Sequence, residues 1–186
     1  MHDETQAPRV FDIERHYPLT PVQQSMLFNS IADGRPGVEI EQVLCTLHET
    51  LDPARFKQAW ALLVQRHAIL RTRFLWQHVE EPRQEVLRDT PLRWENFDWS
   101  DLPDDEREAG WRTLVAAAWL EGFDLAAAPP MRFALVCDGP RDYRFCWTHH
   151  HALIDGRAYV LLLFCSLATA ARPTSCSAPC APGGAR

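Results

Sequence analysis

The chain has 186 residues, of which 46% are hydrophobic and 24% are charged, and its formal net charge is −6. This composition is typical of one globular domain, and an acidic chain with scattered arginines excludes a broad nucleic-acid-binding surface. No run reaches the roughly 20 apolar residues that cross a bilayer, and the N-terminus lacks the apolar stretch of a secretion signal, so we expect a cytoplasmic protein without a membrane partner.

The first half of the chain predicts helices and strands in turn. A threonine N-cap followed by a first-turn proline predicts a helix over 20–33. The alternating segment 38–49 predicts a strand. An Asp-Pro pair starts a second helix over 52–67, and segment 69–77 follows as a strand candidate. The shared face of that second helix carries Phe56, Trp60, Leu63, Val64 and His67.

The second half predicts strands at 83–89 and 91–97 and then a helix opened by an acidic loop. We expect Gly122 to end this helix. Its expected buried stripe consists of Trp111, Leu114, Val115 and Ala118. Strands over 131–138 and 142–151, separated by Gly-Pro-Arg, predict a hairpin. Segment 157–170 is apolar almost all round, which predicts a buried helix.

This order of elements predicts an α/β fold, a two-layer sandwich of a mixed β-sheet with packed helices. We divide the chain into an N-terminal extension over 1–13, a domain over 14–168 and a tail over 169–186. The end of the chain is rich in Ala, Pro, Ser, Cys and Gly and carries no Asp, Glu or Lys from residue 171 on, so we expect the tail to be disordered.

Six cysteines occur in the chain. A chain of this length without a secretion signal does not need a disulfide framework, so we expect free thiols. Three of them lie inside apolar strand-like runs, where a buried thiol is expected: Cys45, Cys137 and Cys146.

Three consecutive histidines, His149, His150 and His151, end the second hairpin strand. Alternation along a strand places His149 and His151 on one face, and two ligands do not make a zinc site. The only close cysteine pair lies in the tail, and neither an H-E-x-x-H nor a G-x-S-x-G motif is present. The run is therefore either a packed polar segment or the carrier of one histidine that acts as a base.

An Asp-Gly pair favours the second interpretation. Asp155 can cap the helix that follows, and Gly156 lets the backbone turn tightly. A neutral imidazole held within about 3 Å of its target takes up a proton near neutral pH.

The stretch HHALIDG, residues 150–156, matches the H-H-x-x-x-D-G signature of condensation domains from nonribosomal peptide synthetases. The signature also marks the wider superfamily of chloramphenicol acetyltransferase-like acyltransferases. YPLTPVQQSMLF, residues 17–28, resembles the first core motif of the condensation family, and RHAILRTRF, residues 66–74, resembles its second. The passage FDLAAAPPMRFALV resembles the segment before the histidine motif, so the resemblance covers about 14–164.

The resemblance implies a chloramphenicol acetyltransferase-like lobe and an acyltransferase activity. His151 would act at the reacting centre, as a base or as a positioner of an α-amine, while His150 would be a packed strand residue and His149 has no assigned role. Asp155 would fix the loop, with Arg66 or Arg71 as its candidate partner. The substrates would be an acyl thioester and an aminoacyl amine on the phosphopantetheine arms of peptidyl carrier proteins, and no cofactor or metal is expected.

A complete condensation domain has two similar lobes, and this chain has material for the first. Three interpretations follow: an N-terminal lobe that is active only with a second polypeptide, a truncated relic or interaction module without turnover, or a chloramphenicol acetyltransferase-like enzyme that self-associates. The first and second core motifs favour the synthetase branch over the third interpretation.

Overall fold

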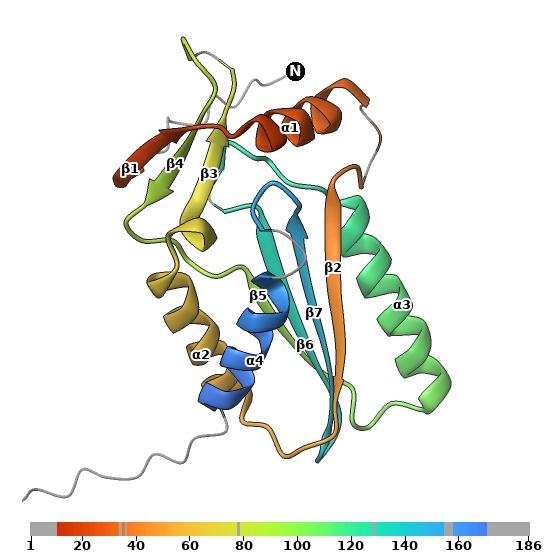
Figure 1. Ribbon diagram of the computed structural model, residues 1–186. Helices are drawn as coiled ribbons and strands as arrows, with labels where there is room; N and C mark the ends of the chain where they lie inside the picture. Colours follow the sequence, from red (N-terminus) through yellow and green to blue (C-terminus); the bar gives the residue numbers. More distant parts are fainter. Residues whose placement is uncertain are drawn as a thin grey trace, which may run out of the picture.

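The computed structural model describes residues 11–33, 35, 37–77, 79–127, 129–154 and 158–170. Its helices and strands follow the predicted order, with two elements that were not predicted, the strand Ile13–Pro18 and the 3-10 turn Ala68–Arg71 (Figure 1). In chain order they are β1 Ile13–Pro18, α1 Pro21–Asp33, β2 Ile40–Leu47, α2 Pro53–Arg66, a 3-10 turn Ala68–Arg71, β3 Thr72–Leu75, β4 Arg83–Leu87, β5 Trp94–Asp98, α3 Asp104–Leu120, β6 Met131–Gly139, β7 Asp142–His150 and α4 Ala158–Ala170.

The strands form two sheets. A four-stranded sheet has the order β2-β7-β6-β5, with β5 and β6 parallel and the other pairs antiparallel. A three-stranded antiparallel sheet has the order β1-β4-β3. The predicted α/β class with a mixed sheet and packed helices is confirmed. The second sheet was not predicted; it forms because the short connection between β3 and β4 favours pairing of these two strands with each other.

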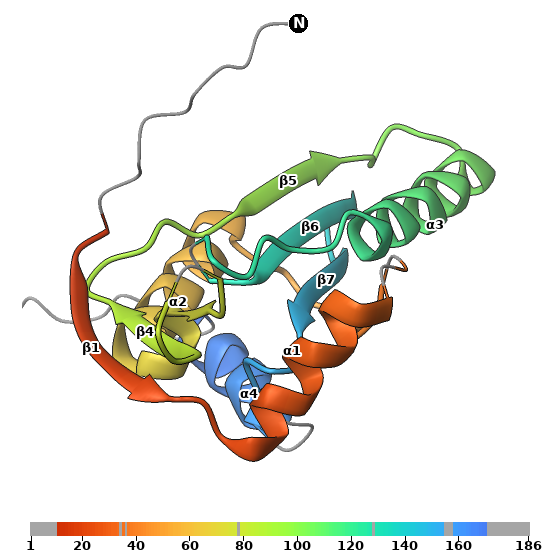
Figure 2. The same ribbon diagram turned by 90° about the horizontal axis from the view of Figure 1, so that it is seen from above.

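Helices cover both faces of the four-stranded sheet, with α2 and α4 on one side and α3 on the other (Figure 2). Alternate residues of β6 and β7 therefore enter different layers. Phe133, Phe145 and Trp147 contact Trp60 of α2, with ring centroids 4.7 to 5.7 Å apart. On the other face, the side-chain amide of Gln42 in β2 donates to the backbone carbonyl of Val115 in α3 at 2.9 Å.

The predicted face of α2 is confirmed for Phe56, Trp60, Leu63 and Val64, which are all buried. The prediction was wrong for His67, which follows the last helical residue as the C-cap and is only partly buried. Asp52 caps the helix as predicted, and its carboxylate accepts from the backbone N–H groups of residues 54 and 55. Burial of this aromatic-rich face anchors α2 on the four-stranded sheet.

The stripe predicted for α3 faces the sheet, but the structure corrects its burial. Trp111, Leu114, Val115 and Ala118 are only half-buried, and no residue of α3 is fully buried. The sheet face beneath α3 carries polar groups, including Gln42 and Thr148, so this layer packs less tightly. The helix ends at Leu120, and Gly122 adopts a left-handed conformation with φ of 62°, as predicted for the terminating glycine.

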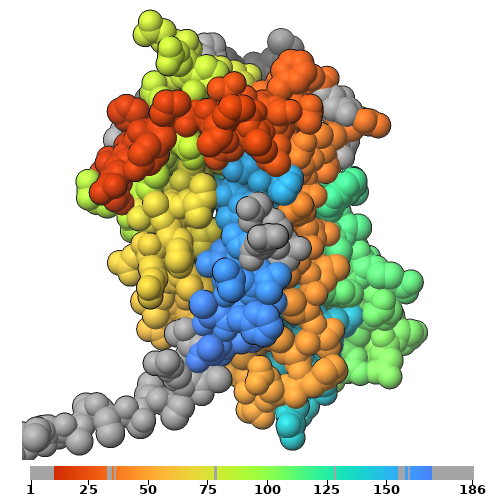
Figure 3. Space-filling view, in the orientation of Figure 1, coloured from red at the N-terminus to blue at the C-terminus, as the bar shows by residue number. Residues whose placement is uncertain are grey.

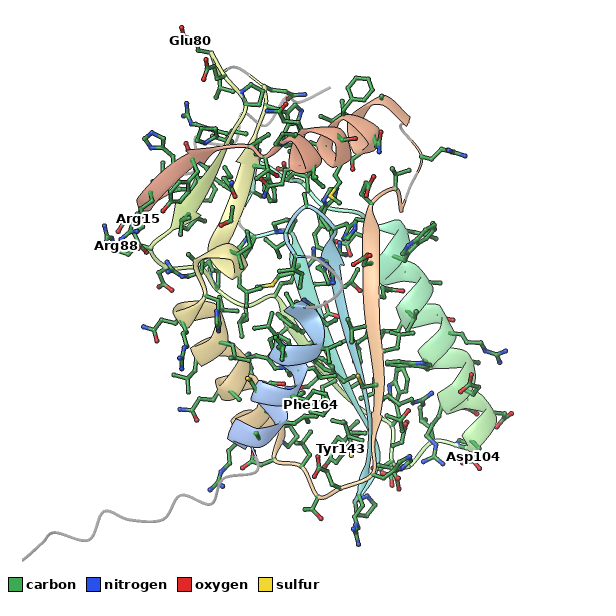
Figure 4. The ribbon with its side chains drawn as sticks, viewed as in Figure 1. Arg15, Glu80, Arg88, Asp104, Tyr143 and Phe164 are labelled. Atoms are coloured by element: carbon green, nitrogen blue, oxygen red, sulfur yellow. The ribbon has the colours of Figure 1, made fainter. Side chains whose placement is uncertain are left out.

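The structure also corrects the prediction that the last helix is buried all round. One face of α4 contacts α2, and Leu162 and Ser166 are buried there. Leu161 and Phe164 are each 68% exposed on the outer face, and α4 lies on the molecular surface (Figures 3 and 4). The apolar outer face is therefore available to a partner.

Cys45, Cys137 and Cys146 are free thiols, as predicted. Cys146 is buried, whereas Cys45 and Cys137 are only partly buried and Cys165 is exposed on α4. Burial raises the pKa of the Cys45 and Cys146 thiols. No helix among the described residues combines the length and the apolar character that crossing a membrane requires. The tail from residue 171 on lies outside the described residues.

Candidate active site

The histidine run lies where β7 ends, beneath α1 (Figure 1). Three backbone hydrogen bonds fix this end of the strand. The N–H of His150 donates to the carbonyl of Pro130 at 3.0 Å, that of His151 to Glu39 at 2.7 Å and that of Leu153 to His150 at 3.0 Å. Consecutive histidines are thereby held in three different environments.

His150 is buried and hydrogen-bonded at both ring nitrogens. Its Nδ1 accepts from the backbone N–H of Ala152 at 3.1 Å, so we assign the proton to Nε2, which lies 2.7 Å from the hydroxyl oxygen of Ser30. The Ser30 hydroxyl donates in turn to the carbonyl of Met26. Burial lowers the pKa of His150 to about 4, so this ring is neutral at pH 7 and links α1 to the end of β7.

His149 is fully buried and contacts the ring of Trp147, with centroids 4.9 Å apart. Burial lowers the pKa of His149 to about 4, so this ring is also neutral at pH 7. A buried neutral ring has no access to a substrate in this structure.

His151 differs from both because its side chain is 28% exposed. Its Nδ1 lies 3.3 Å from the carbonyl oxygen of Ile154 and 3.3 Å from a carboxylate oxygen of Glu41. Both of these groups are acceptors, so we assign the proton to Nδ1. Nε2 then keeps its lone pair, which is the state that a general base requires.

Gln23 joins the first core motif to the histidine loop, a role that the sequence analysis missed. The side-chain oxygen of Gln23 accepts a hydrogen bond from the backbone N–H of Thr20 at 2.9 Å. The backbone N–H of Gln23 donates to the Thr20 hydroxyl at 3.2 Å, and the two hydrogen bonds form a capping box. The amide of Gln23 also donates to the carbonyl of Ala152 at 3.3 Å. The Thr-x-x-Gln spacing signals the cap, but no sequence signal gives the contact with the loop.

Glu41 was also missed. Its strand was predicted, but its position opposite His149 depends on the register between β2 and β7, which the sequence does not reveal.

The supporting residues Asp155 and Gly156 lie outside the described residues, so their roles stay predictions. Of the two candidate partners of Asp155, Arg66 is exposed at the end of α2. Arg71 is buried, and its guanidinium binds the Glu14 carboxylate at 2.9 Å and the Val64 carbonyl at 3.2 Å. Within the described residues, Arg71 thus connects α2 to the three-stranded sheet.

No group of three or more His, Cys, Asp or Glu side chains in the described ranges is arranged to hold a metal ion. The histidine run is instead a strand end on which one ring, that of residue 151, is accessible to solvent.

The structure is thus an α/β sandwich in which a partly exposed histidine follows the last strand of the mixed sheet. The family model for the condensation domain matches residues 13–168. The chain belongs to the condensation-domain family and corresponds to its N-terminal portion.

Sequence relatives include several components of linear gramicidin synthase from Brevibacillus parabrevis. The chain is 38% identical to one of these proteins over 151 residues, which covers 81% of this chain and 2% of that protein. It is 40% identical to another over 144 residues, or 77% of this chain and 3% of that protein. The chain therefore spans only a small fraction of the curated relatives it matches.

Solved condensation domains show the same fold. The starter condensation domain of rhizomide synthetase RzmA superposes with a TM-score of 0.73 at 18% identity, over 82% of this chain and 38% of that one. The first condensation domain of the CDA synthetase gives a TM-score of 0.75 at 20% identity, over 85% of this chain and 40% of that one. The match therefore covers less than half of each solved chain.

Proposed function

We propose that this chain provides the histidine-bearing part of an amide-forming condensation site. The substrates in this proposal are an acyl thioester and an aminoacyl amine, each carried on the phosphopantetheine arm of a carrier protein. The observation that carries the proposal is the state of His151, whose Nδ1 faces two acceptors while its ring is partly open to solvent.

In the reaction, the amine nitrogen attacks the thioester carbonyl carbon. A C–N bond forms, the C–S bond breaks, and the thiol leaves with a proton. Nε2 of His151 is suited to take the proton from the attacking nitrogen and return it to the departing sulfur. A thioester is already an activated acyl donor, so alignment of the two substrates supplies a large part of the rate.

The same chemistry explains why the proposal needs no cofactor or metal. Neither electron transfer nor activation of water occurs in the step, and the proton returns to the leaving group. The carrier arms deliver both reactants.

A second polypeptide lobe is the partner that we propose for the open side of the site. Exposed apolar side chains support this proposal, because exposed apolar patches commonly mark interaction surfaces. They lie on α1 and α4 and comprise Val22, Phe28, Ile31, Val160, Leu161 and Phe164. A self-associating acyltransferase, by contrast, would cover these surfaces with copies of the same chain.

The experiment is reconstitution. The chain is mixed with the C-terminal portion of a related condensation domain, an acyl-loaded carrier protein and an aminoacyl-loaded carrier protein, and the amide product is measured by mass spectrometry. We expect product with wild type and a loss of about 100-fold or more with His151→Ala. The matched control is His48→Ala, which removes an exposed ring at the other end of β2 and should leave the rate unchanged.

Equal rates for wild type and His151→Ala would contradict the role of His151. No product from a demonstrably assembled complex would contradict the proposed activity and favour an interaction module without turnover. Light scattering on the chain alone would identify a self-associated enzyme by a defined oligomer.

A further inference from the structure

Glu41 lies in β2, directly opposite His149 in the register with β7. Its carboxylate oxygen Oε2 is 3.3 Å from Nδ1 of His151 and 3.9 Å from Nε2 of His149. The strand pairing therefore holds one acidic group against the histidine run.

This oxygen is buried, yet it accepts no hydrogen bond from the described residues. The Nδ1–H of His151 donates to the carbonyl of Ile154. The carboxylate oxygen Oε2 of Glu41 lies near this N–H group but accepts no hydrogen bond from it. A buried acceptor without a donor is costly, and a catalytic role is one of the explanations for such a group in a native protein.

The charges around Glu41 indicate what that purpose is. Burial keeps His149 and His150 neutral, with pKa values lowered to about 4, so neither ring offers the carboxylate a positive charge near pH 7. His151 is the partly exposed member of the run, and a proton taken up at its Nε2 would create a cation 3.3 Å from Oε2.

We propose that Glu41 is a positioning residue for His151. Its carboxylate and the Ile154 carbonyl together keep the proton on Nδ1, which leaves Nε2 free to act as the base. The same carboxylate balances the positive charge that the ring acquires during proton transfer, as an acidic residue does beside a catalytic imidazole. This role rests on the proposed function of His151, because it acts through that ring.

Ring ¹⁵N chemical shifts test the proposal on the chain alone, since they distinguish the Nδ1–H and Nε2–H tautomers of a neutral imidazole. We expect His151 in wild type to be mainly the Nδ1–H tautomer. In Glu41→Gln, the ratio of Nδ1–H to Nε2–H should fall roughly tenfold, because the negative charge 3.3 Å from Nδ1 is lost and the new amide can donate to Nδ1.

Glu39→Gln is the matched control. This substitution removes the same charge two residues away from Glu41. In wild type the Glu39 carboxylate accepts a hydrogen bond from the Asn29 amide at 3.0 Å. The control should keep the wild-type tautomer. If Glu41→Gln does not fold, Glu41→Asp withdraws the carboxylate by one methylene group, and we expect a smaller shift in the same direction.

An unchanged tautomer ratio in a folded Glu41 variant would overturn the proposal, as would equal changes in the Glu39 control. This readout needs neither a second lobe nor carrier proteins. A failed reconstitution with an intact tautomer effect would therefore count against the condensation activity alone, and the reverse result would count against Glu41 alone.

Discussion

The two sheets use charged and polar residues in different ways. In the three-stranded sheet, buried charges are matched: the Glu85 carboxylate binds Arg73 at 2.7 Å and Arg83 at 2.9 Å. At the end of the four-stranded sheet, the carboxylate oxygen of Glu41 has no donor among the described residues, and the neighbouring ring of His151 is partly exposed.

This difference indicates that the second core motif supports the fold, whereas the histidine motif carries the proposed catalytic residue. The second core motif, residues 66–74, contributes buried Leu70 and Phe74, and the backbone N–H of Phe74 donates to Leu125 at 2.8 Å. The histidine motif carries His151, whose ring is partly exposed to solvent. Two sequence motifs of similar strength therefore have different physical roles, one in stability and one in the proposed reaction.

The largest expected effect of a single substitution is on the core that supports the histidine strand. Trp60→Ala should lower the free energy of unfolding by about 4 kcal/mol, because Trp60 is fully buried against three aromatic rings of β6 and β7. Urea denaturation measures the change. Leu62→Ala on the same helix removes a side chain that is 51% exposed and should cost far less; equal losses would show that this face is not the core.

Acid should affect the four-stranded sheet first. Burial lowers the pKa of His149 and His150 from 6.5 to about 4. Between pH 6.5 and 4 these two rings bind more protons in the unfolded chain than in the folded chain, so the free energy of unfolding falls as the pH falls. The total loss over this range is about 3 kcal/mol per ring. Unfolding curves from pH 7 to 4 should show this loss, and His149→Met should remove about half of it. A flat profile would contradict the burial of both rings.

The three-stranded sheet should respond at lower pH. Burial raises the pKa of Glu85, but hydrogen bonds from Arg73 and Arg83 lower it more, so the net pKa lies below the ordinary 4.5. The stabilisation is present above about 4.5 and is lost as the pH falls through the lower folded value. Glu85→Ala should cost about 3 kcal/mol at pH 7, because it leaves the largely covered Arg73 guanidinium without this partner. A loss below about 0.5 kcal/mol would show that the ion pair is not stabilising.

The smallest effect is expected at the start of α1. Thr20→Ala removes the hydroxyl that accepts from the backbone N–H of Gln23 and should cost about 1 kcal/mol in thermal or urea unfolding. Thr113→Ala on the exposed part of α3 is the control and should change stability less. A cost similar to that of the control would show that the cap does not stabilise α1.

The sequence predicted most of the elements because their local signals are strong, but the strand β1 was missed. The Thr-Pro and Asp-Pro starts of α1 and α2 and the Gly-Pro-Arg hairpin each depend on a few neighbouring residues. The burial of α3 and α4 was predicted less well, because it depends on which sheet face or helix each one meets.

Only the part of the site that has a local sequence signal was predicted. His151 stands in a local motif, whereas Gln23 and Glu41 reach the loop through long-range strand and helix packing. Periodicity does not encode the register of β2 against β7, and this register decides which acidic side chain lies beside the histidines.

Two variants test most directly whether the three-stranded sheet serves stability and the end of the four-stranded sheet serves the proposed reaction. The free energy of unfolding and the single-turnover rate of amide formation are measured for His151→Ala and Glu85→Ala in the reconstituted complex. The account predicts near-wild-type stability with a rate at least about 100-fold lower for His151→Ala, and lower stability with a normal rate per folded molecule for Glu85→Ala. A normal rate for folded His151→Ala would contradict it.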